Sequence, residues 1–267
     1  MPTRTYVVVD LETTGLDPQL EAILEIAAVR LEAGRVVASW QTLVKPPADV
    51  PISAASLAIH GISAEMVADA PLIQTALVDF VTFLGEAPVV AHNASFDLGF
   101  LNKALATAGL PALANESFDT LEMSREVFPE ARSHKLEALC RLLGREGAAF
   151  HRAADDAGHL AAVFPRLLDL WQQKRAWYRA QFGQADQLAR RWDQLQKLID
   201  DLQVEQAELR RVLGAYFVEH PDAQIPLPGG DLLVRAAKTT WEYDLEALRP
   251  HLAAWGVADR LLKLDRD

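Results

Sequence analysis

The 267-residue sequence predicts an α/β protein, in which a mixed β-sheet flanked by helices is followed by a mainly helical C-terminal appendage. Two observations predict this fold class. Residues 5–43 form a strand meander that gives way to alternating strands and helices, which is typical of a sheet covered by helices. Beyond residue 170 a long helical period begins, and five of the six tryptophans lie there. We therefore predict one domain in residues 1–170 and a second in residues 171–267.

The strands are predicted from short apolar runs. Tyr6–Val9 indicates a buried strand that leads into the Thr-Thr-Gly turn at residues 13–15. Residues 22–44 indicate two more strands, joined at Ala33–Arg35, so the chain opens as an antiparallel meander. Two short strands are expected later, in the segment APVVAHN and near Glu116–Asp119.

The helices of the first domain are predicted from helical spacing of apolar residues and from proline and serine start signals. They cover Ser53–Gly61, Ser63–Ala68, residues 71–84, Phe96–Ala108, Lys135–Leu143 and the chain from about Ala154 onward. Ser95 is the expected N-cap of the helix over Phe96–Ala108, because a serine hydroxyl can accept a hydrogen bond from the first helical turn.

A heptad pattern predicts a long helix over residues 186–213. Its apolar residues recur in steps of four and three, with Gln206 at the one polar position, and they are Leu188, Trp192, Leu195, Ile199, Leu202, Leu209 and Leu213. The segment HPDAQIPLPGGD ends this helix. A strand or hairpin over Leu232–Tyr243 and a terminal helix over Leu245–Leu264 complete the predicted appendage.

Three roles for the heptad helix are open. It can pair with a second copy or a partner helix, with Gln206 setting the register, or it can fold back against the helix near Phe164–Phe182. In the third role, cations contact phosphates and aromatic rings stack on bases of a nucleic acid. The residues for that role are Lys174, Arg175, Trp177, Tyr178, Arg179, Arg190, Arg191 and Trp192.

Composition is ordinary for a soluble globular protein, with 50% hydrophobic and 24% charged residues. Cys140 is alone, which excludes a disulfide framework or a thiolate metal cluster and fits a cytoplasmic location. We expect no signal peptide or transmembrane helix. The net charge of −11 is unusual for a nucleic-acid binder, but basic residues gather in 132–152 and 172–197, and a carboxylate metal site is itself acidic.

Two carboxylates at the end of the first strand are the most informative feature. Because side chains on a strand alternate between faces, Asp10 and Glu12 point the same way. Adjacent carboxylates raise each other's pKa unless a cation neutralises them. Mg²⁺ and Mn²⁺ prefer oxygen ligands, so the pair predicts a divalent-metal site and favours a nuclease.

Further acidic residues and one histidine extend this chemistry. Asp97 follows the strand in APVVAHN, at the start of a helix, where an acid can also serve the helix dipole. In the segment HRAADDA, His151 precedes two adjacent acids, Asp155 and Asp156. Five residues of helix turn by about 140°, so His151 and Asp156 share a site only if His151 lies in the loop before the helix.

As a set, these motifs resemble the DnaQ-like 3′→5′ exonucleases of the DEDDh group, in the RNase H-like superfamily. Asp10 and Glu12 in VVVDLETTGLD, Asp97 in AHNASFDLGFL, and His151 with Asp156 in HRAADDA match the family pattern in order. HGISAEMVADAP and SHKLEALCRLLG also resemble its connecting segments. The resemblance covers residues 5–168, selects Asp156 over Asp155, and implies a five-stranded mixed sheet.

The resemblance also implies a mechanism, which is two-metal hydrolysis of phosphodiester bonds from a 3′ end with release of nucleoside 5′-monophosphates. Asp10 would bridge two Mg²⁺ or Mn²⁺ ions, Glu12 and Asp156 would hold one of them, and Asp97 would support the other. His151 would be the general base, since an ordinary imidazole pKa of about 6.5 suits that task. Thr13 and Thr14 would contact the terminal nucleotide, and His92 and Asn93 are further candidate substrate contacts or packing residues.

The family is broader than one function. It includes polymerase proofreading subunits, separate DNA exonucleases and RNA-trimming enzymes. We expect a DNA substrate and a role in DNA repair or replication, because no motif indicates recognition of a ribose 2′-hydroxyl. The alternatives are an RNA 3′-end-trimming exoribonuclease and a catalytically silent nucleic-acid-binding or assembly module.

Overall fold

The computed structural model describes residues 4–145, 150–226 and 232–234. The chain divides into two compact units, the first ending at Gly183 and the second beginning at Gln184. The helix that begins at Ala153 runs through residue 170 without a break and ends at Ala180, so it belongs to the first unit. Among the described residues, no helix is both long enough and apolar enough to cross a membrane.

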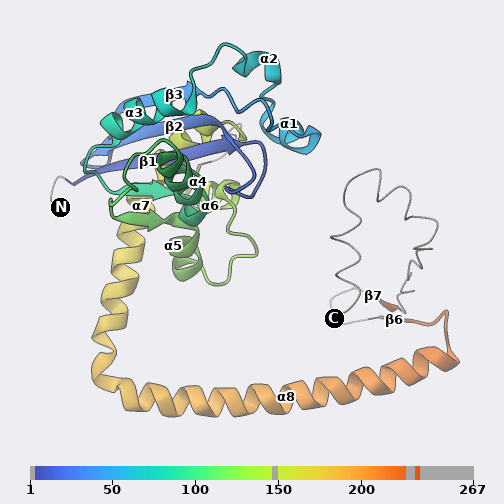
Figure 1. The fold of residues 1–267 in the computed structure, drawn as a ribbon. Helices are drawn as coiled ribbons and strands as arrows, with labels where there is room; N and C mark the ends of the chain where they lie inside the picture. The colour runs from blue at the N-terminus through green and yellow to red at the C-terminus, as the bar shows by residue number, and fades with distance from the viewer. Residues whose placement is uncertain (1–3, 146–149, 227–231, 235–267) are drawn as a thin grey trace, which may run out of the picture. The chain divides into compact units, whose positions relative to one another are not determined.

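The first unit is built on a five-stranded mixed sheet with the order β3-β2-β1-β4-β5 (Figure 1). Its strands are β1 (Thr5–Thr13), β2 (Ile23–Glu32), β3 (Arg35–Leu43), β4 (Val89–Ala91) and β5 (Ser117–Asp119). The first three are antiparallel neighbours, whereas β4 runs parallel to β1 and β5 parallel to β4. Ala33 and Gly34 join β2 to β3 with positive φ angles at both residues, as a two-residue hairpin requires.

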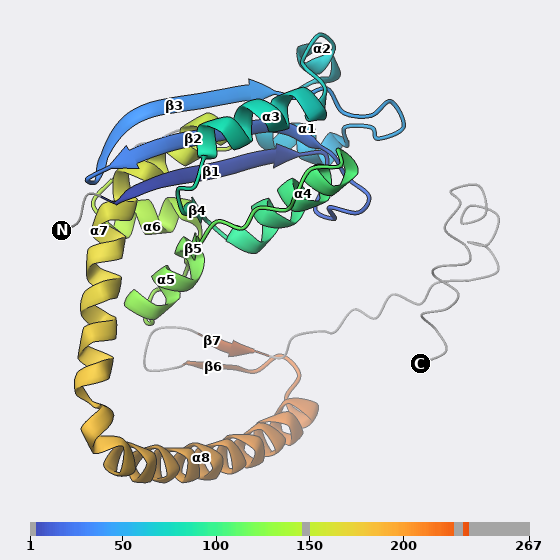
Figure 2. The ribbon, with the colours of Figure 1, turned by 60° about the vertical axis from the view of Figure 1, so that its left-hand side comes forward.

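Helices cover both faces of this sheet (Figure 2). They are α1 (Ala54–His60), α2 (Ala64–Val67), α3 (Ile73–Leu84), α4 (Ala94–Thr107), α5 (Thr120–Val127), α6 (Leu136–Leu142) and α7 (Ala153–Ala180). On one face, α3 and α4 pack against a core that includes Val7 and Val9. On the other face, α5, α6 and α7 pack against a core that includes Val8. Because β1 alternates, Asp10 and Glu12 share the face of Val8, on which α7 lies.

The second unit contains one long helix, α8 (Ala185–Glu219), after a 3-10 turn over Phe182–Gln184. Phe217 is the buried residue of α8, and the apolar heptad residues are exposed, for example Trp192 (66%) and Leu202 (54%). Two short strands, β6 (Gln224–Pro226) and β7 (Leu232–Val234), pair antiparallel. Within the described residues, the apolar side of α8 is therefore largely open to solvent.

The structure confirms the predicted fold class, namely a mixed five-stranded sheet flanked by helices with a long helix near the C-terminus. The Ser95 cap is wrong, because α4 begins at Ala94 and its N-cap is Asn93, in the left-handed conformation. Helix α5 was not predicted, and it is only eight residues long. Most of the predicted Leu232–Tyr243 strand and the whole Leu245–Leu264 helix lie outside the described residues.

Candidate active site

Strand β1 presents two carboxylates at its C-terminal end. Asp10 and Glu12 are partly exposed, whereas Leu11 between them is buried against the opposite face. In the register of β1 with β2, Glu12 stands opposite Glu25, and the pairing shifts between Glu12 and Thr13. The irregularity ends the ladder directly after the two acids, as β-bulges commonly do beside functional sites.

A third carboxylate comes from the first turn of α7. One oxygen atom each of Asp10, Glu12 and Asp156 lie within 4.8 Å of one another, and the described residues hold one such group. Asp155, the neighbouring acid, is exposed to solvent. The structure thus brings Asp156, and not Asp155, beside the acids of β1.

Asp97 adds a fourth carboxylate. It lies in the first turn of α4 and is only 4% exposed. After burial, its negative charge is the largest influence on Asp10, and it raises the pKa of that carboxyl. Four acids from β1, α4 and α7 therefore converge on one place, although they are separated by up to 146 positions in the chain.

Burial raises the pKa of every member of this cluster, and repulsion between its carboxylates adds to this at Asp10, Glu12 and Asp97. Burial first, and then Asp97, Asp156, Glu12 and Glu25, hold the pKa of Asp10 well above its ordinary value. Burial and the charge of Asp156 raise the pKa of Glu12 to about 7. Burial raises the pKa of Asp97 to about 8, and burial also raises that of Asp156. Without a cation, the cluster therefore retains protons near neutral pH.

The donor set fits a divalent-cation site. Oδ1 of Asp156 is buried and has no hydrogen-bond partner among the described residues, while Oδ2 accepts a hydrogen bond of 3.1 Å from the backbone N–H of His151. Buried polar atoms are normally paired, so an unpaired carboxylate oxygen close to other carboxylates fits a site that binds a cation. Carboxylate oxygens are the ligands that Mg²⁺ and Mn²⁺ prefer.

His151 lies in the loop before α7, as expected, because the helix begins at Ala153. Its φ of 75° is in the left-handed region, which costs a non-glycine residue about 1–3 kcal/mol. The ring is exposed, and Nε2 lies 3.6 Å from Oε1 of Glu137. Its positive charge, when present, lowers the pKa of Asp156, so the imidazole lies at the edge of the cluster.

Glu25 and Arg152 hold the start of α7 on the sheet, and sequence reasoning missed both. Nε and Nη2 of Arg152 donate to the two carboxylate oxygens of Glu25, at 3.1 and 2.9 Å. The backbone N–H of Ala153 donates to Glu25 at 3.2 Å. Glu25 is 3% exposed, and a bidentate pair of this kind fixes orientation as well as distance. A charged residue that interrupts the apolar first half of β2 was the signal that could have identified Glu25.

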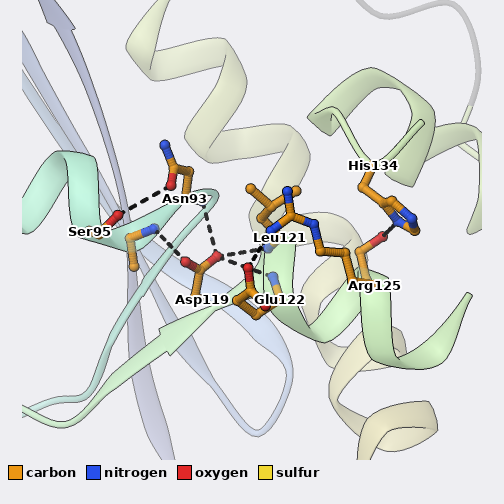
Figure 3. Close-up of polar contacts among 9 residues, drawn as sticks. Asn93, Ser95, Asp119, Leu121, Glu122, Arg125 and His134 are labelled. Carbon is orange, nitrogen blue, oxygen red and sulfur yellow. Dashed lines mark hydrogen bonds and ion pairs between the residues drawn. The ribbon is translucent and has the colours of Figure 1, made fainter. Parts of the chain in front are cut away.

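Asp119 joins two helix starts at the same edge of the sheet (Figure 3). Its carboxylate accepts hydrogen bonds from the backbone N–H groups of Asn93 and Ala94 at the start of α4, both at 3.1 Å. It also accepts from Leu121 (2.9 Å) and Glu122 (3.4 Å) at the start of α5. One side chain therefore caps both helices and positions the turn that carries Asp97.

The hydroxyl groups of Thr13 and Thr14 are engaged within their own loop. Thr13 donates to the carbonyl of Gly15 at 2.6 Å. Thr14, which is 1% exposed, donates to Glu21 and accepts from the N–H of Ala22 at 2.9 Å. These bonds shape the loop after β1, beside the carboxylates.

His92 and Asn93 follow β4 at the same edge of the sheet. Nδ1 of His92 lies 3.1 Å from the hydroxyl of Thr120, which itself donates to the carbonyl of Ala91. Asn93 is exposed, and its Oδ1 accepts a hydrogen bond from Ser95 at 3.3 Å (Figure 3).

The fold and the site define a class of protein. A five-stranded mixed sheet of the RNase H-like kind carries a cluster of acids that fits divalent cations at the end of its first strand. The family model described as exonuclease (RNase_T) matches residues 7–164. The chain belongs to the exonuclease family.

Particular relatives agree with this assignment. The chain is 36% identical over 165 residues to the DNA polymerase III PolC-type of Bacillus cereus, covering 62% of this chain and 11% of that protein. It thus spans only about a tenth of the length of these curated relatives. Exonuclease X, solved in complex with 5′ overhanging duplex DNA, is 32% identical with a TM-score of 0.51, covering 61% of this chain and 91% of that one. A 3′-exonuclease solved with a histone mRNA stem-loop, at 19% identity, TM-score 0.55, and coverage of 62% and 64%, shares the fold.

The raised pKa values predict a stability that depends on pH and metal. Without divalent ions, the melting temperature should fall as pH rises from about 5 to about 8. The folded-state pKa values of Glu12 (about 7) and Asp97 (about 8) exceed the ordinary 4.5 and 3.8, so folding favours the protonated carboxyls and this stability is lost as they ionise. Adding Mn²⁺ should raise the melting temperature by at least about 4 °C at pH 8 and by less at pH 6, and thermal denaturation measures both changes.

The Asp10→Asn variant is the control for this measurement, because it removes one of the repelling charges. Its metal-free melting temperature should change less between the same two pH values, and Mn²⁺ should stabilise it less. Identical pH profiles for the variant and the wild type would contradict the assignment of the pH dependence to this cluster.

Arg152→Gln is expected to destabilise the protein on the order of 3 kcal/mol, because it leaves Glu25 buried and charged. Replacing both partners, Glu25→Gln with Arg152→Gln, should recover part of that loss in urea denaturation. Arg4→Gln is the matched control, since Arg4 pairs with Glu116 at an exposed position and should cost about 1 kcal/mol or less. A double variant less stable than Arg152→Gln alone would refute the pairing argument.

Proposed function

We propose that the chain is a metal-dependent 3′→5′ exonuclease, which hydrolyses phosphodiester bonds at nucleic-acid 3′ ends and releases nucleoside 5′-monophosphates. The observation that carries the proposal is the convergence of Asp10, Glu12, Asp97 and Asp156, with an unpaired oxygen on Asp156, in a chain of the exonuclease family. Such a group has little structural use without cations, because its members repel one another.

In this proposal, the four carboxylates hold two divalent ions, Mg²⁺ or Mn²⁺. When bound, these ions supply charge stabilisation to the phosphate and acidify water. Asp10 and Glu12 are positioned by β1, Asp156 by the Glu25–Arg152 pair, and Asp97 by the cap that Asp119 provides. His151 acts as the general base, because its exposed ring lies in the loop directly before the helix that carries Asp156.

The proposed substrate is DNA, and the proposed role is in DNA replication or repair. The 32%-identical relative was solved with duplex DNA, and the curated relatives are DNA polymerases by name. An RNA 3′-end-trimming activity and a catalytically silent binding module are the alternatives. Thr13, Thr14, His92 and Asn93 are the proposed substrate contacts, with the two threonines acting through the loop that their hydroxyls hold in place.

We further propose a separate role for residues 171–267. The exposed apolar residues of α8 favour pairing through the 186–213 heptad, either with a second copy of this chain or with another helix. A cytoplasmic location is proposed from the free, buried Cys140.

The test of the proposed activity uses matched 5′-labelled DNA and RNA with Mg²⁺, Mn²⁺ or EDTA. We expect metal-dependent shortening from the 3′ end, faster on DNA. Asp10→Ala and Asp156→Asn should each lower the rate at least about 100-fold, because several kcal/mol of charge stabilisation depend on the cluster. Asp155→Asn is the matched control, since Asp155 is adjacent but exposed, and its rate should stay near that of the wild type.

The outcomes separate the alternatives. If RNA is shortened faster than DNA, the protein is an exoribonuclease and the proposed DNA substrate is wrong. If neither polymer is shortened with either metal but both are still bound, the protein is a catalytically silent binding module. Equal losses in Asp155→Asn and Asp156→Asn would overturn the assignment of Asp156 as the metal-holding acid.

His151→Ala should lower kcat by about 10²- to 10⁴-fold, the usual contribution of a positioned general base. The variant should keep the Mn²⁺-induced rise in melting temperature, because the imidazole lies at the edge of the acids rather than among them. Asp156→Asn should lose both activity and that rise. Loss of the metal effect in His151→Ala would make His151 a metal ligand instead of the base.

A further inference from the structure

A basic hollow opens beside the acidic cluster. Its volume is about 410 Å³, and its lining includes three cations and two imidazoles. They are Arg125, Arg132, Lys135, His92 and His134. Leu121, Ser133 and Leu136 complete the lining, so none of the described residues around the hollow is acidic. In a chain with a net charge of −11, a concave surface whose charged side chains are all basic is unexpected.

Two of the three cations have no ion-pair partner among the residues that the structure describes. Arg125 pairs with Glu122, one turn away on α5. Arg132 and Lys135 are exposed, and no ion pair joins either side chain to another residue in the described parts of the chain. These two side chains are therefore available to an anion from solvent.

The walls of the hollow are held by hydrogen bonds. Nδ1 of His134 lies 2.9 Å from the hydroxyl of Ser124, which is fully buried in α5 (Figure 3). Nδ1 of His92 lies 3.1 Å from the hydroxyl of Thr120, which is also fully buried. Both rings are thus anchored to α5, and they give the cationic side chains a rigid floor.

The sheet register places this hollow next to the carboxylates. Val8 of β1 is level with Val90 of the parallel strand β4. Two residues beyond that pair lie Asp10, near the end of β1, and His92, directly after the end of β4. Asp119, at the end of β5, is the next residue along the same edge, and α5 follows it directly. The hollow and the acids share the carboxyl edge of the parallel strands, where open α/β sheets bind ligands.

We propose that this hollow binds a backbone phosphate of the nucleic acid, at a position in the strand beyond the phosphate that is hydrolysed. The inference rests on the proposed function. A polyanion approaching the acidic cluster meets repulsion unless cations lie along its path, and Arg132 and Lys135 supply them in the hollow that His92 also lines. Because the contact is to phosphate, it adds affinity without reading the base sequence.

The test measures binding apart from hydrolysis. Fluorescence anisotropy of a labelled single-stranded DNA is recorded with Mg²⁺ in the Asp10→Asn background, where the proposed reaction does not proceed. Arg132→Gln and Lys135→Gln should each weaken binding roughly 3- to 10-fold at about 0.05 M salt. Each should also reduce the slope of log Kd against log salt by about 0.7, the value for one lost phosphate contact on a single strand.

Arg35→Gln is the matched control. Arg35 is an exposed arginine at the start of β3, and it pairs with Glu32 in the register at the opposite end of the sheet from Glu12. The Arg35→Gln variant loses the same charge far from the hollow, so its slope of log Kd against log salt should equal that of the parent. Equal slopes for all three variants, or no binding by the parent, would overturn the proposal.

The proposal and the proposed activity fail separately. If the wild type shortens DNA but Arg132→Gln and Lys135→Gln bind with the parental salt slope, the exonuclease stands and the hollow is not a phosphate site. If the wild type never shortens nucleic acid but the two variants lose slope, the hollow binds phosphate in a protein that does not hydrolyse it.

Discussion

Mutual repulsion among four carboxylates is the constraint on which the rest of this structure depends. Asp10, Glu12, Asp97 and Asp156 are held together at the end of β1 although burial and proximity raise the pKa of each. Clustering like charges costs free energy, which the fold has to offset elsewhere. A divalent cation removes that cost, and the family to which the chain belongs supplies the chemical reason for keeping the cluster.

Two buried or capping carboxylates offset the cost by fixing the elements that carry the acids. Glu25 accepts three hydrogen bonds from the start of α7, including a bidentate pair from Arg152. Asp119 accepts from the first N–H groups of both α4 and α5. These acids are satisfied by donors, in contrast to the cluster, so the same residue type has a supporting role in one place and a reactive role in another. Rigid support of this kind keeps catalytic geometry within tight limits.

Charge is distributed so that an acidic protein can accept a polyanion. The net charge of −11 is a total over all residues and does not show where positive and negative side chains lie on the surface. At the carboxyl edge of the parallel strands, acids that fit cations lie beside a hollow lined by Arg125, Arg132 and Lys135. Fields of this kind act locally, because salt screens exposed charges beyond about 10 Å. Local arrangement therefore matters more than net charge in judging whether such a chain can bind nucleic acid.

The sequence by itself determined the sheet, the helices of the first unit other than α5, the long helix α8 and the acidic motifs. Strand alternation places Asp10 and Glu12 on one face, and helical and heptad periods give α3 and α8, because these signals depend only on neighbouring residues. The predicted start of α4 was wrong. The backbone N–H of Asn93 at this helix start donates to Asp119, which is 26 positions away in the chain, so no local sequence pattern indicates this contact. Glu25, Arg152 and the basic hollow likewise arise from contacts across strands and helices. Only the tertiary structure could decide them, since distance in space, burial and local field are properties of the packed chain.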